Sequence, residues 1–257
     1  MPLLRGTRPL KRWRWVGVFS EEIMLCAATV QIAVARQSFW ALWLRGRELR
    51  DHTRMLPRSS ELRLGAGVMR IEDLGVSLAV ELDEEDGIVA RCPHGRHEAW
   101  TRKQAGVPAR VRLSVAGAPV HVGDARAVID DSAGHHARET EWRWSAGVGI
   151  GEDGEALAWN LVSGINDPPS GSERAVWIDG RAREAPPVVF APALDGITCV
   201  DGSRLSFEAE ARRSRTDNLL IVRSQYTAPF GTFSGTLPGG VRLASGLGVM
   251  EHHRARW

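Results

Sequence analysis

The sequence contains little cysteine and almost no lysine. Its three cysteines, Cys26, Cys92 and Cys199, are odd in number and far apart, which excludes a disulfide-stabilised scaffold and favours a reducing cytosol. Lysine occurs only at Lys11 and Lys103, so arginine supplies nearly all of the basic residues. Because nothing in protein physics demands this bias, we attribute it to a GC-rich bacterial genome and infer no function from it.

The chain also lacks a large net charge and a long apolar run. The formal net charge is +2, and basic and acidic residues are mixed along the chain, which excludes an extended electrostatic surface for nucleic acid. The uncharged run at residues 23–35 is shorter than the ~20 residues of a membrane-spanning helix. Glu21 and Glu22 interrupt the apolar core that a signal peptide needs. We therefore expect a soluble, cytoplasmic protein without a membrane span.

Motifs for nucleotide, hydrolase or metal chemistry are missing as well. The sequence contains no Gly-x-Ser-x-Gly, Walker loop, dinucleotide fingerprint or zinc-protease helix. Cys92, His94 and His97 are ligand-type residues, but no second cluster follows at a standard spacing. His135 and His136 are adjacent, so a strand would point them to opposite faces. We expect neither a metal nor a cofactor.

The residues that are present predict β-structure. The chain is 43% hydrophobic and carries 27 glycines. Residues 11–19 alternate, with arginines on one face and tryptophans on the other, which predicts buried Trp13 and Trp15 and exposed Arg12 and Arg14. Turn sequences at residues 83–87 and 151–154 indicate hairpins.

Such short segments recur along the chain, and none shows a sustained apolar period of 3.6 residues. This pattern predicts an all-β protein, either a lipocalin-like antiparallel β-barrel or two barrel-like β halves. Residues 117–127 form the weakest join, so we divide the chain into halves 1–126 and 127–257. A single continuous β domain fits the pattern almost equally well.

Residues 130–144 are the most informative segment, because they combine four carboxylates, two imidazoles and two guanidinium groups with two indoles. On a strand, Glu139, Glu141 and Arg143 share one face, while Trp142 and Trp144 share the other. The tryptophan face belongs to the core. The charged face is either a solvated surface with an ion pair, or a polar interior where Glu141 and Arg143 pair across a cavity.

Three other segments place polar groups among apolar ones. Residues 159–169 carry two amides, and residues 226–235 contain the single tyrosine. On the last strand, Glu251 and His253 share a face with Leu247 and Val249. Polar groups on an apolar face need partners, and we favour a hydrogen-bonded closure of the barrel for that strand.

Five segments spread over almost the whole chain resemble the bacterial family called domain of unknown function 2804 (DUF2804). They are residues 6–18, 100–103, 135–144, 159–164 and 229–231. More distantly, the chain is similar to the lipocalin-like group of carotenoid hydratases and tocopherol cyclase-type enzymes. That resemblance implies two barrel-like halves and an acidic motif ending in Glu-Trp that protonates an alkene between them. Glu141-Trp142 is the nearest match, with Glu139 in place of the expected Asp.

Two hypotheses follow. The first is a cofactor-independent hydratase, cyclase or isomerase acting on an apolar, isoprenoid- or lipid-like molecule, with catalytic residues drawn from Glu141, Glu139, Asp131, His135 and His136. The alternative is a non-catalytic binder of a hydrophobic ligand, and a substrate-free remnant is a third interpretation. In the first two hypotheses the ligand-binding residues are Trp142, Arg143, Trp144, Trp159, Asn160, Asn166 and Tyr226. A desolvated carboxyl group distinguishes the enzyme from the binder, because only the enzyme requires one.

Overall fold

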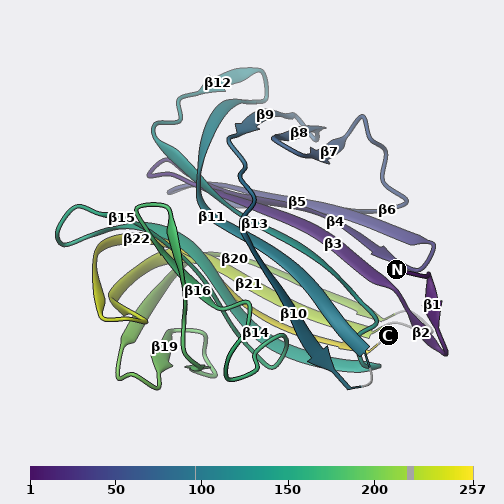
Figure 1. The fold of residues 1–257 in the computed structure, drawn as a ribbon. Helices are drawn as coiled ribbons and strands as arrows, with labels where there is room; N and C mark the ends of the chain where they lie inside the picture. The colour runs from purple at the N-terminus through teal and green to yellow at the C-terminus, as the bar shows by residue number, and fades with distance from the viewer. Residues whose placement is uncertain (96, 219–222, 257) are drawn as a thin grey trace.

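Strands make up the regular structure of the computed structural model, which describes residues 1–95, 97–218 and 223–256. These ranges contain two large antiparallel sheets and a short hairpin of β1 (Leu4–Arg5) and β2 (Arg8–Pro9). Both large sheets are curled, and one lies above the other in Figure 1. The prediction of an all-β chain with two barrel-like halves is confirmed. Within the described residues, no helix has the length and hydropathy that crossing a membrane requires.

The N-terminal sheet has the strand order β6-β5-β4-β3-β13-β11-β9-β8-β7, and β10 and β12 pair with β11. Its strands are β3 (Lys11–Phe19), β4 (Ile23–Ile32), β5 (Ala35–Leu44), β6 (Arg50–Met55), β7 (Leu62–Gly65), β8 (Val68–Asp73), β9 (Val76–Leu82), β10 (Ile88–His94), β11 (His97–Val115), β12 (Ala118–Val120) and β13 (Ala125–Gly134).

A β-bulge bends the long strand β11 at Gly106, whose φ of 77° suits glycine. Before the bulge β11 pairs with β10, and after it β11 pairs with β9. The hairpin predicted at residues 83–87 is therefore wrong, because β9 and β10 pair with β11 and not with each other. The hairpin predicted at residues 151–154 is confirmed.

The C-terminal sheet has the strand order β17-β16-β15-β14-β22-β21-β20-β19-β18. Its strands are β14 (Glu139–Gly151), β15 (Ala156–Ser163), β16 (Ala175–Ile178), β17 (Arg181–Glu184), β18 (Val188–Phe190), β19 (Gly196–Cys199), β20 (Arg204–Asn218), β21 (Arg223–Leu237) and β22 (Val241–Arg256). The chain passes from the first sheet to the second between Gly134 and Glu139. The division expected after residue 126 falls inside β13 instead, because the weak join at residues 117–127 precedes the last strand of the first sheet.

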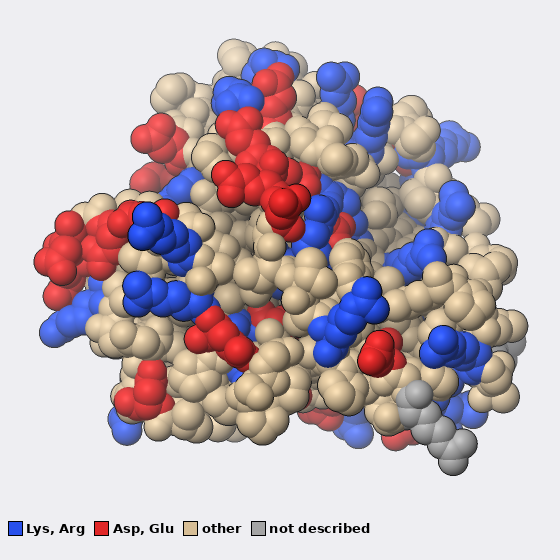
Figure 2. All heavy atoms as spheres, in the orientation of Figure 1, with Lys and Arg blue, Asp and Glu red and all other residues tan. Residues whose placement is uncertain are grey.

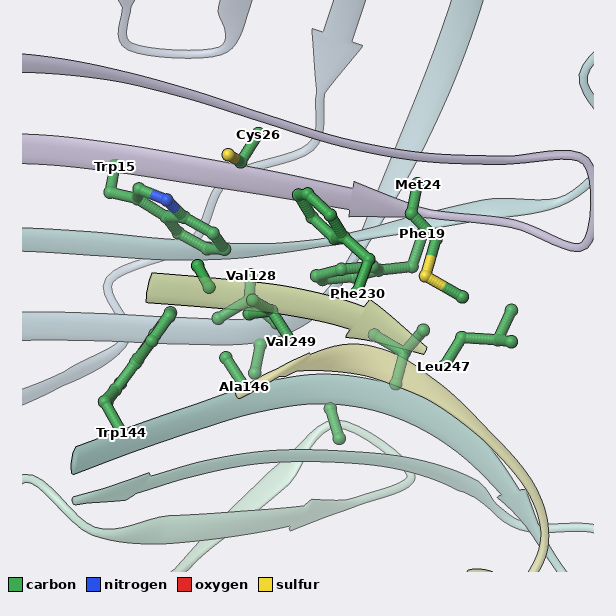
Figure 3. Close-up of a cluster of buried hydrophobic side chains, with 14 of the residues drawn as sticks. Trp15, Phe19, Met24, Cys26, Val128, Trp144, Ala146, Phe230, Leu247 and Val249 are labelled. Carbon is green, nitrogen blue, oxygen red and sulfur yellow. The ribbon is translucent and has the colours of Figure 1, made fainter. Parts of the chain in front are cut away.

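Three apolar clusters fill the protein. One lies within each curled sheet, and the third lies between the sheets. In the inter-sheet cluster, side chains from β3, β4 and β13 meet side chains from β14, β21 and β22 (Figure 3). The edge of the Trp15 indole meets Trp144 of the other sheet at a centroid distance of 4.9 Å, an arrangement that aromatic rings favour.

The burial of side chains along β3 agrees only in part with the alternation predicted for residues 11–19. Trp15 is buried between the sheets, Trp13 is half-buried and Arg12 is exposed. Arg14 is not exposed, however, because its face turns into the N-terminal half and not to solvent. There its guanidinium group donates to Asp131 at 2.8 Å and contacts Glu84. Both faces of this strand are therefore covered.

Gly17 leaves room for the Trp15 indole. A Cβ atom at this position would come within 2.2 Å of Trp15 Cη2, so we expect Gly17→Ala to lower the free energy of unfolding by about 1–3 kcal/mol through overpacking. Urea denaturation would measure this change in the free energy of unfolding. Gly65→Ala on β7 is the control, since its Cβ would meet only a Val68 methyl at 3.3 Å. Equal effects of the two changes would contradict this account of the core.

Charged side chains of both signs are interspersed over the face shown in Figure 2. Exposed ion pairs in the protein include Arg110 with Asp83 at 2.9 Å and Arg112 with Glu81 at 3.0 Å. Exposed pairs of this kind contribute little to stability. The ionisable groups with larger energetic consequences are buried.

Candidate functional site

Polar side chains interrupt the apolar inter-sheet cluster. Strand parity places them there: Lys103 on β11 lies opposite Asp130 on β13, and Asp130 lies opposite Trp15 on β3. From the other sheet, Glu251 follows Leu247 and Val249 on the same face of β22. We call these groups and their hydrogen-bond partners the inter-sheet polar layer.

Glu251 is a buried carboxyl group of this layer, with 8% of its surface exposed. Trp142 donates its indole N–H to Glu251 Oε1 at 2.8 Å, and the Tyr226 hydroxyl donates a second hydrogen bond. Burial raises the pKa of Glu251 to about 7 against the weaker lowering effect of these hydrogen bonds. Among the described residues, no lysine or arginine forms an ion pair with this carboxyl group. The Glu251 carboxyl group is therefore partly protonated near neutral pH.

Aromatic rings surround this carboxyl group. The Trp142 ring lies 4.3 Å from the His253 ring, and the Tyr226 ring meets the same imidazole edge-on at 5.5 Å. Burial lowers the pKa of His253 to about 3, so the imidazole is neutral at physiological pH. The Arg213 guanidinium group lies over Tyr226, 5.0 Å from the ring centroid. These π faces could stabilise a developing positive charge.

A second group in the layer is ionic. Lys103 Nζ lies 2.7 Å from Asp130 Oδ1 and 3.2 Å from Glu173 Oε1, and the lysine and Glu173 are almost fully buried. Burial alone would lower the pKa of Lys103, but the two carboxylates outweigh it and the pKa is raised. Burial raises the pKa of Glu173 despite the nearby ammonium group. The lysine therefore holds carboxyl groups from both halves together.

Hydrogen bonds extend this ionic group into the C-terminal sheet. Asn166 donates to Glu173 Oε2 at 2.9 Å, and Asn160 donates to the Glu173 backbone carbonyl at 2.8 Å. The Trp144 indole N–H donates to Asn160 Oδ1 at 2.8 Å. On the other side, Trp13 donates to Asp130 Oδ2 at 3.0 Å. The charge on Asp130 also contributes to the raised pKa of Glu251, so the two parts of the layer are electrostatically coupled.

The structure brings together five of the predicted ligand-binding residues. Trp142 and Tyr226 contact Glu251, whereas Trp144, Asn160 and Asn166 belong to the network around Glu173. Trp159 faces the core of the C-terminal half instead, where its ring packs against Phe233. Arg143 shares the face of Glu141, outside the layer.

Glu141 and Glu139 do not lie in this layer, which corrects the expectation of a cavity lined by Glu141 and Arg143. Both glutamates are exposed: Glu141 pairs with His252 at 2.9 Å, and Glu139 pairs with Arg256 at 3.5 Å. The hydrogen bond from His252 lowers the pKa of Glu141, opposite to what a general acid requires. The charged face of β14 is therefore solvated at this end.

The remaining predicted catalytic residues lie at other places. Asp131 follows Asp130 on β13, so it points to the opposite face and pairs with Arg14. His135 contacts the Pro2 carbonyl at 2.9 Å, and His136 stacks on Trp13 at 5.3 Å. Burial lowers the pKa of His136 to about 3. Within the described residues, no group of three or more His, Cys, Asp or Glu is arranged to hold a metal ion.

The sequence does not predict the ionic group, and Glu251 is not among the catalytic residues predicted from it. Lys103 is one of only two lysines, which is its one signal in the sequence, because polar residues adjoin it on both sides. Glu173 carries no comparable signal, because it lies in a loop that only the fold brings against β11. Glu251 was placed correctly among apolar neighbours, and hydrogen bonds partner it as expected.

A small hollow lies beside the layer. It has a volume of about 200 Å³ and is bounded by Ile88 and Ala90 of β10 and by Ser172, Arg174 and Ala175 of the other half. Ser172 and Arg174 flank Glu173 in the chain. The hollow therefore opens between the two halves, near the ionic part of the layer.

Comparison with solved structures shows the same fold in proteins of low sequence identity. Kievitone hydratase from Nectria haematococca superposes with a TM-score of 0.58 at 12% identity, over 94% of this chain and 88% of that one. A candidate AttH protein from Nitrosomonas europaea gives 0.55 at 12% identity, over 97% and 93%. CghA gives 0.55 at 6% identity, over 96% and 88%.

A search of curated proteins found no match. The sequence profile of one family, Domain of unknown function (DUF2804), matches residues 52–257, which is most of the chain and includes every residue of the inter-sheet polar layer except Trp13. The resemblance seen in the separate sequence segments is therefore confirmed, and the protein belongs to the DUF2804 family.

Proposed function

We propose that the protein is a cofactor-independent acid catalyst of the hydratase, cyclase or isomerase type, and that Glu251 is its proton donor. The substrate class is an apolar, alkene-containing molecule of the isoprenoid or lipid kind. The observation that carries the proposal is the buried Glu251 carboxyl group, whose pKa burial raises to about 7 although the Arg213 charge lowers it slightly. Among the described residues, no lysine or arginine forms an ion pair with it. A general acid works best when its pKa lies near the operating pH.

The chemistry needs only groups of this chain, water and the substrate. The Glu251 O–H bond breaks as its proton forms a C–H bond with an alkene carbon, and the carboxylate remains. The neighbouring carbon becomes cationic and faces the aromatic rings of Trp142 and Tyr226. Water addition followed by loss of a proton completes a hydration, and loss of a different proton completes an isomerisation. Attack by a second alkene closes a ring and forms a new cation, and loss of a proton from that cation completes a cyclisation. In each outcome a proton returns to Glu251.

Support also comes from the fold. Kievitone hydratase and CghA share the arrangement of two curled sheets, and a hydratase on this fold is consistent with chemistry between the halves. The hollow of about 200 Å³ beside β10 lies between the two halves, next to the residues that flank Glu173. A binder of a hydrophobic ligand would not need the desolvated Glu251.

Deuterium incorporation tests the proposed proton transfer. The purified protein is incubated in D2O with geraniol, farnesol and geranylgeraniol, and the products are analysed by mass spectrometry. We expect a C–D bond in at least one product with the wild type and none with Glu251→Gln, while ligand binding, measured by tryptophan fluorescence, persists. Glu141→Gln is the control and should behave as the wild type, because Glu141 is exposed. Incorporation by Glu251→Gln would contradict the assignment of the acid.

The pH profile of turnover follows from the same carboxyl group. Since the donor must be protonated, kcat should be constant in acid and should fall about tenfold per pH unit above the pKa of about 7. A stopped assay between about pH 5 and pH 9, in buffers of constant ionic strength, measures this. A rate that rises through pH 7 would instead indicate a general base.

A further inference from the structure

The N-terminal half contains a second hollow, which adjoins the inter-sheet polar layer at Trp13. It has a volume of about 970 Å³ and is lined by residues from the start of β3, the end of β4, the start of β11 and the end of β13. Its floor adjoins the core of this half, because Leu62 belongs to both. We call it the arginine cavity after the six arginines that line it, which are Arg12, Arg14, Arg36, Arg58, Arg91 and Arg102.

Strand pairing assembles these arginines on one face. Arg14 on β3 lies opposite Asp131 on β13, and Asp131 lies opposite Arg102 on β11. One pair further along, Arg12 lies opposite Gln31 on β4, and Gln31 lies opposite Arg36 on β5. Because every second residue points to the same side, the arginines converge although they come from separate strands.

The charges in the cavity do not balance. Among the described residues, Asp131 is the single acidic residue that lines it, and Arg14 and Arg102 already pair with it at 2.8 and 2.7 Å. Both arginines also pair with Glu84, which lies outside the lining. In the described part of the chain, no ion pair involves Arg12, Arg36, Arg58 or Arg91. A concave surface with this excess of positive charge attracts an anion.

The cavity walls also contain apolar side chains, which favour a ligand with an apolar part. Trp100 lies opposite Ala133 on the same face as Arg12, and Pro57, Leu62 and Val30 line the cavity as well. A guanidinium group binds a carboxylate through two parallel hydrogen bonds. The volume of about 970 Å³ lies at the upper end of small-molecule sites.

We propose that the arginine cavity is a binding site for an apolar molecule that carries a carboxylate head group. The unpaired arginines bind the carboxylate, and Trp100 and Leu62 contact the apolar body. Trp13 borders both regions, because it lines the cavity and donates to Asp130. The proposed site does not depend on the acid chemistry of Glu251, because Glu251 does not line the cavity.

The experiment compares decanoate with decanol by isothermal titration calorimetry, with fluorescence of the native tryptophans as a second readout. We expect decanoate to bind and decanol to bind at least about tenfold more weakly, because only the carboxylate forms charge-assisted hydrogen bonds. The variant Arg36→Glu with Arg91→Glu should weaken decanoate at least about tenfold. Both positions are exposed, so the fold should persist. Arg58→Gln is a milder second variant and should weaken binding in the same direction.

The control variant is Arg181→Glu with Arg183→Glu, two exposed arginines of β17 outside the cavity, which should leave decanoate affinity unchanged. Several results would overturn the proposal: decanol binding as tightly as decanoate, decanoate failing to bind the wild type, or equal loss in the cavity and control variants. Inorganic phosphate binding as tightly as decanoate would also overturn it, because the apolar body would then contribute nothing.

Discussion

Replacing Lys103 with methionine should lower the free energy of unfolding by about 3–5 kcal/mol, because removal of one member of a buried ionic group leaves the others uncompensated. The Lys103 ammonium group lies 2.7 Å from Asp130 and 3.2 Å from Glu173. Without it, two carboxyl groups between the sheets face each other without a cation. Urea denaturation by circular dichroism would show a lower midpoint with little change in slope.

Two further variants separate this effect from a general loss of charge. Arg110→Met removes an exposed arginine that pairs with Asp83 and should change stability little. The double change Lys103→Met with Glu173→Gln should recover part of the loss, because one uncompensated carboxyl group is removed. If Lys103→Met and Arg110→Met had equally small effects, the ionic group would not hold the halves together.

Replacing Glu251 with glutamine should change the pH dependence of stability. The folded pKa of Glu251 is about 7, above the value near 4.3 in an unfolded chain. The wild type therefore has the full contribution of this group below the unfolded pKa and loses it as the pH rises through the folded pKa. From about pH 4.5 to pH 8, this loss amounts to about 3 kcal/mol.

Glutamine cannot ionise, so the variant should gain stability relative to the wild type as the pH rises over that range. Thermal unfolding at several pH values measures the difference. Glu141→Gln is the matched control and should show almost no pH-dependent difference over that range, because the hydrogen bond from His252 lowers the pKa of Glu141 and moves its titration to more acidic pH. A stability difference between Glu251→Gln and the wild type that is independent of pH would show that Glu251 is not desolvated.

The sequence predicts the fold well where alternation is local. The tryptophan face of β14 and the apolar face of β22 follow directly from side-chain parity. Side-chain parity predicts which residues share a face of a strand, but it does not predict whether protein or solvent covers that face. The sequence therefore predicts an exposed Arg14, although its face turns into the N-terminal half. For Glu141 the sequence leaves two alternatives, a cavity or solvent, and the structure places it in solvent.

The candidate site is less accessible to sequence reasoning because it is assembled from distant segments. Glu173 reaches Lys103 from a loop in the other half, and Asp51 of β6 reaches Arg213 on β20. No local pattern encodes such pairs. What the sequence does show is the cost of burying polar groups: Glu251 shares a strand face with Leu247 and Val249 and stands out for this reason. Lys103 does not stand out in this way, because Arg102 and Gln104 adjoin it.

The central claim is that Glu251 carries a proton near neutral pH, and a direct titration of its carboxyl carbon tests it. Protein labelled with ¹³C at glutamate side-chain carboxyl groups is titrated by NMR, and the Glu251 signal is assigned by its absence in Glu251→Gln. We predict a midpoint of about 7 for this signal. A midpoint near the 4.3 of an exposed glutamate would contradict the account, because Glu251 would then be an ordinary carboxylate without a proton to donate.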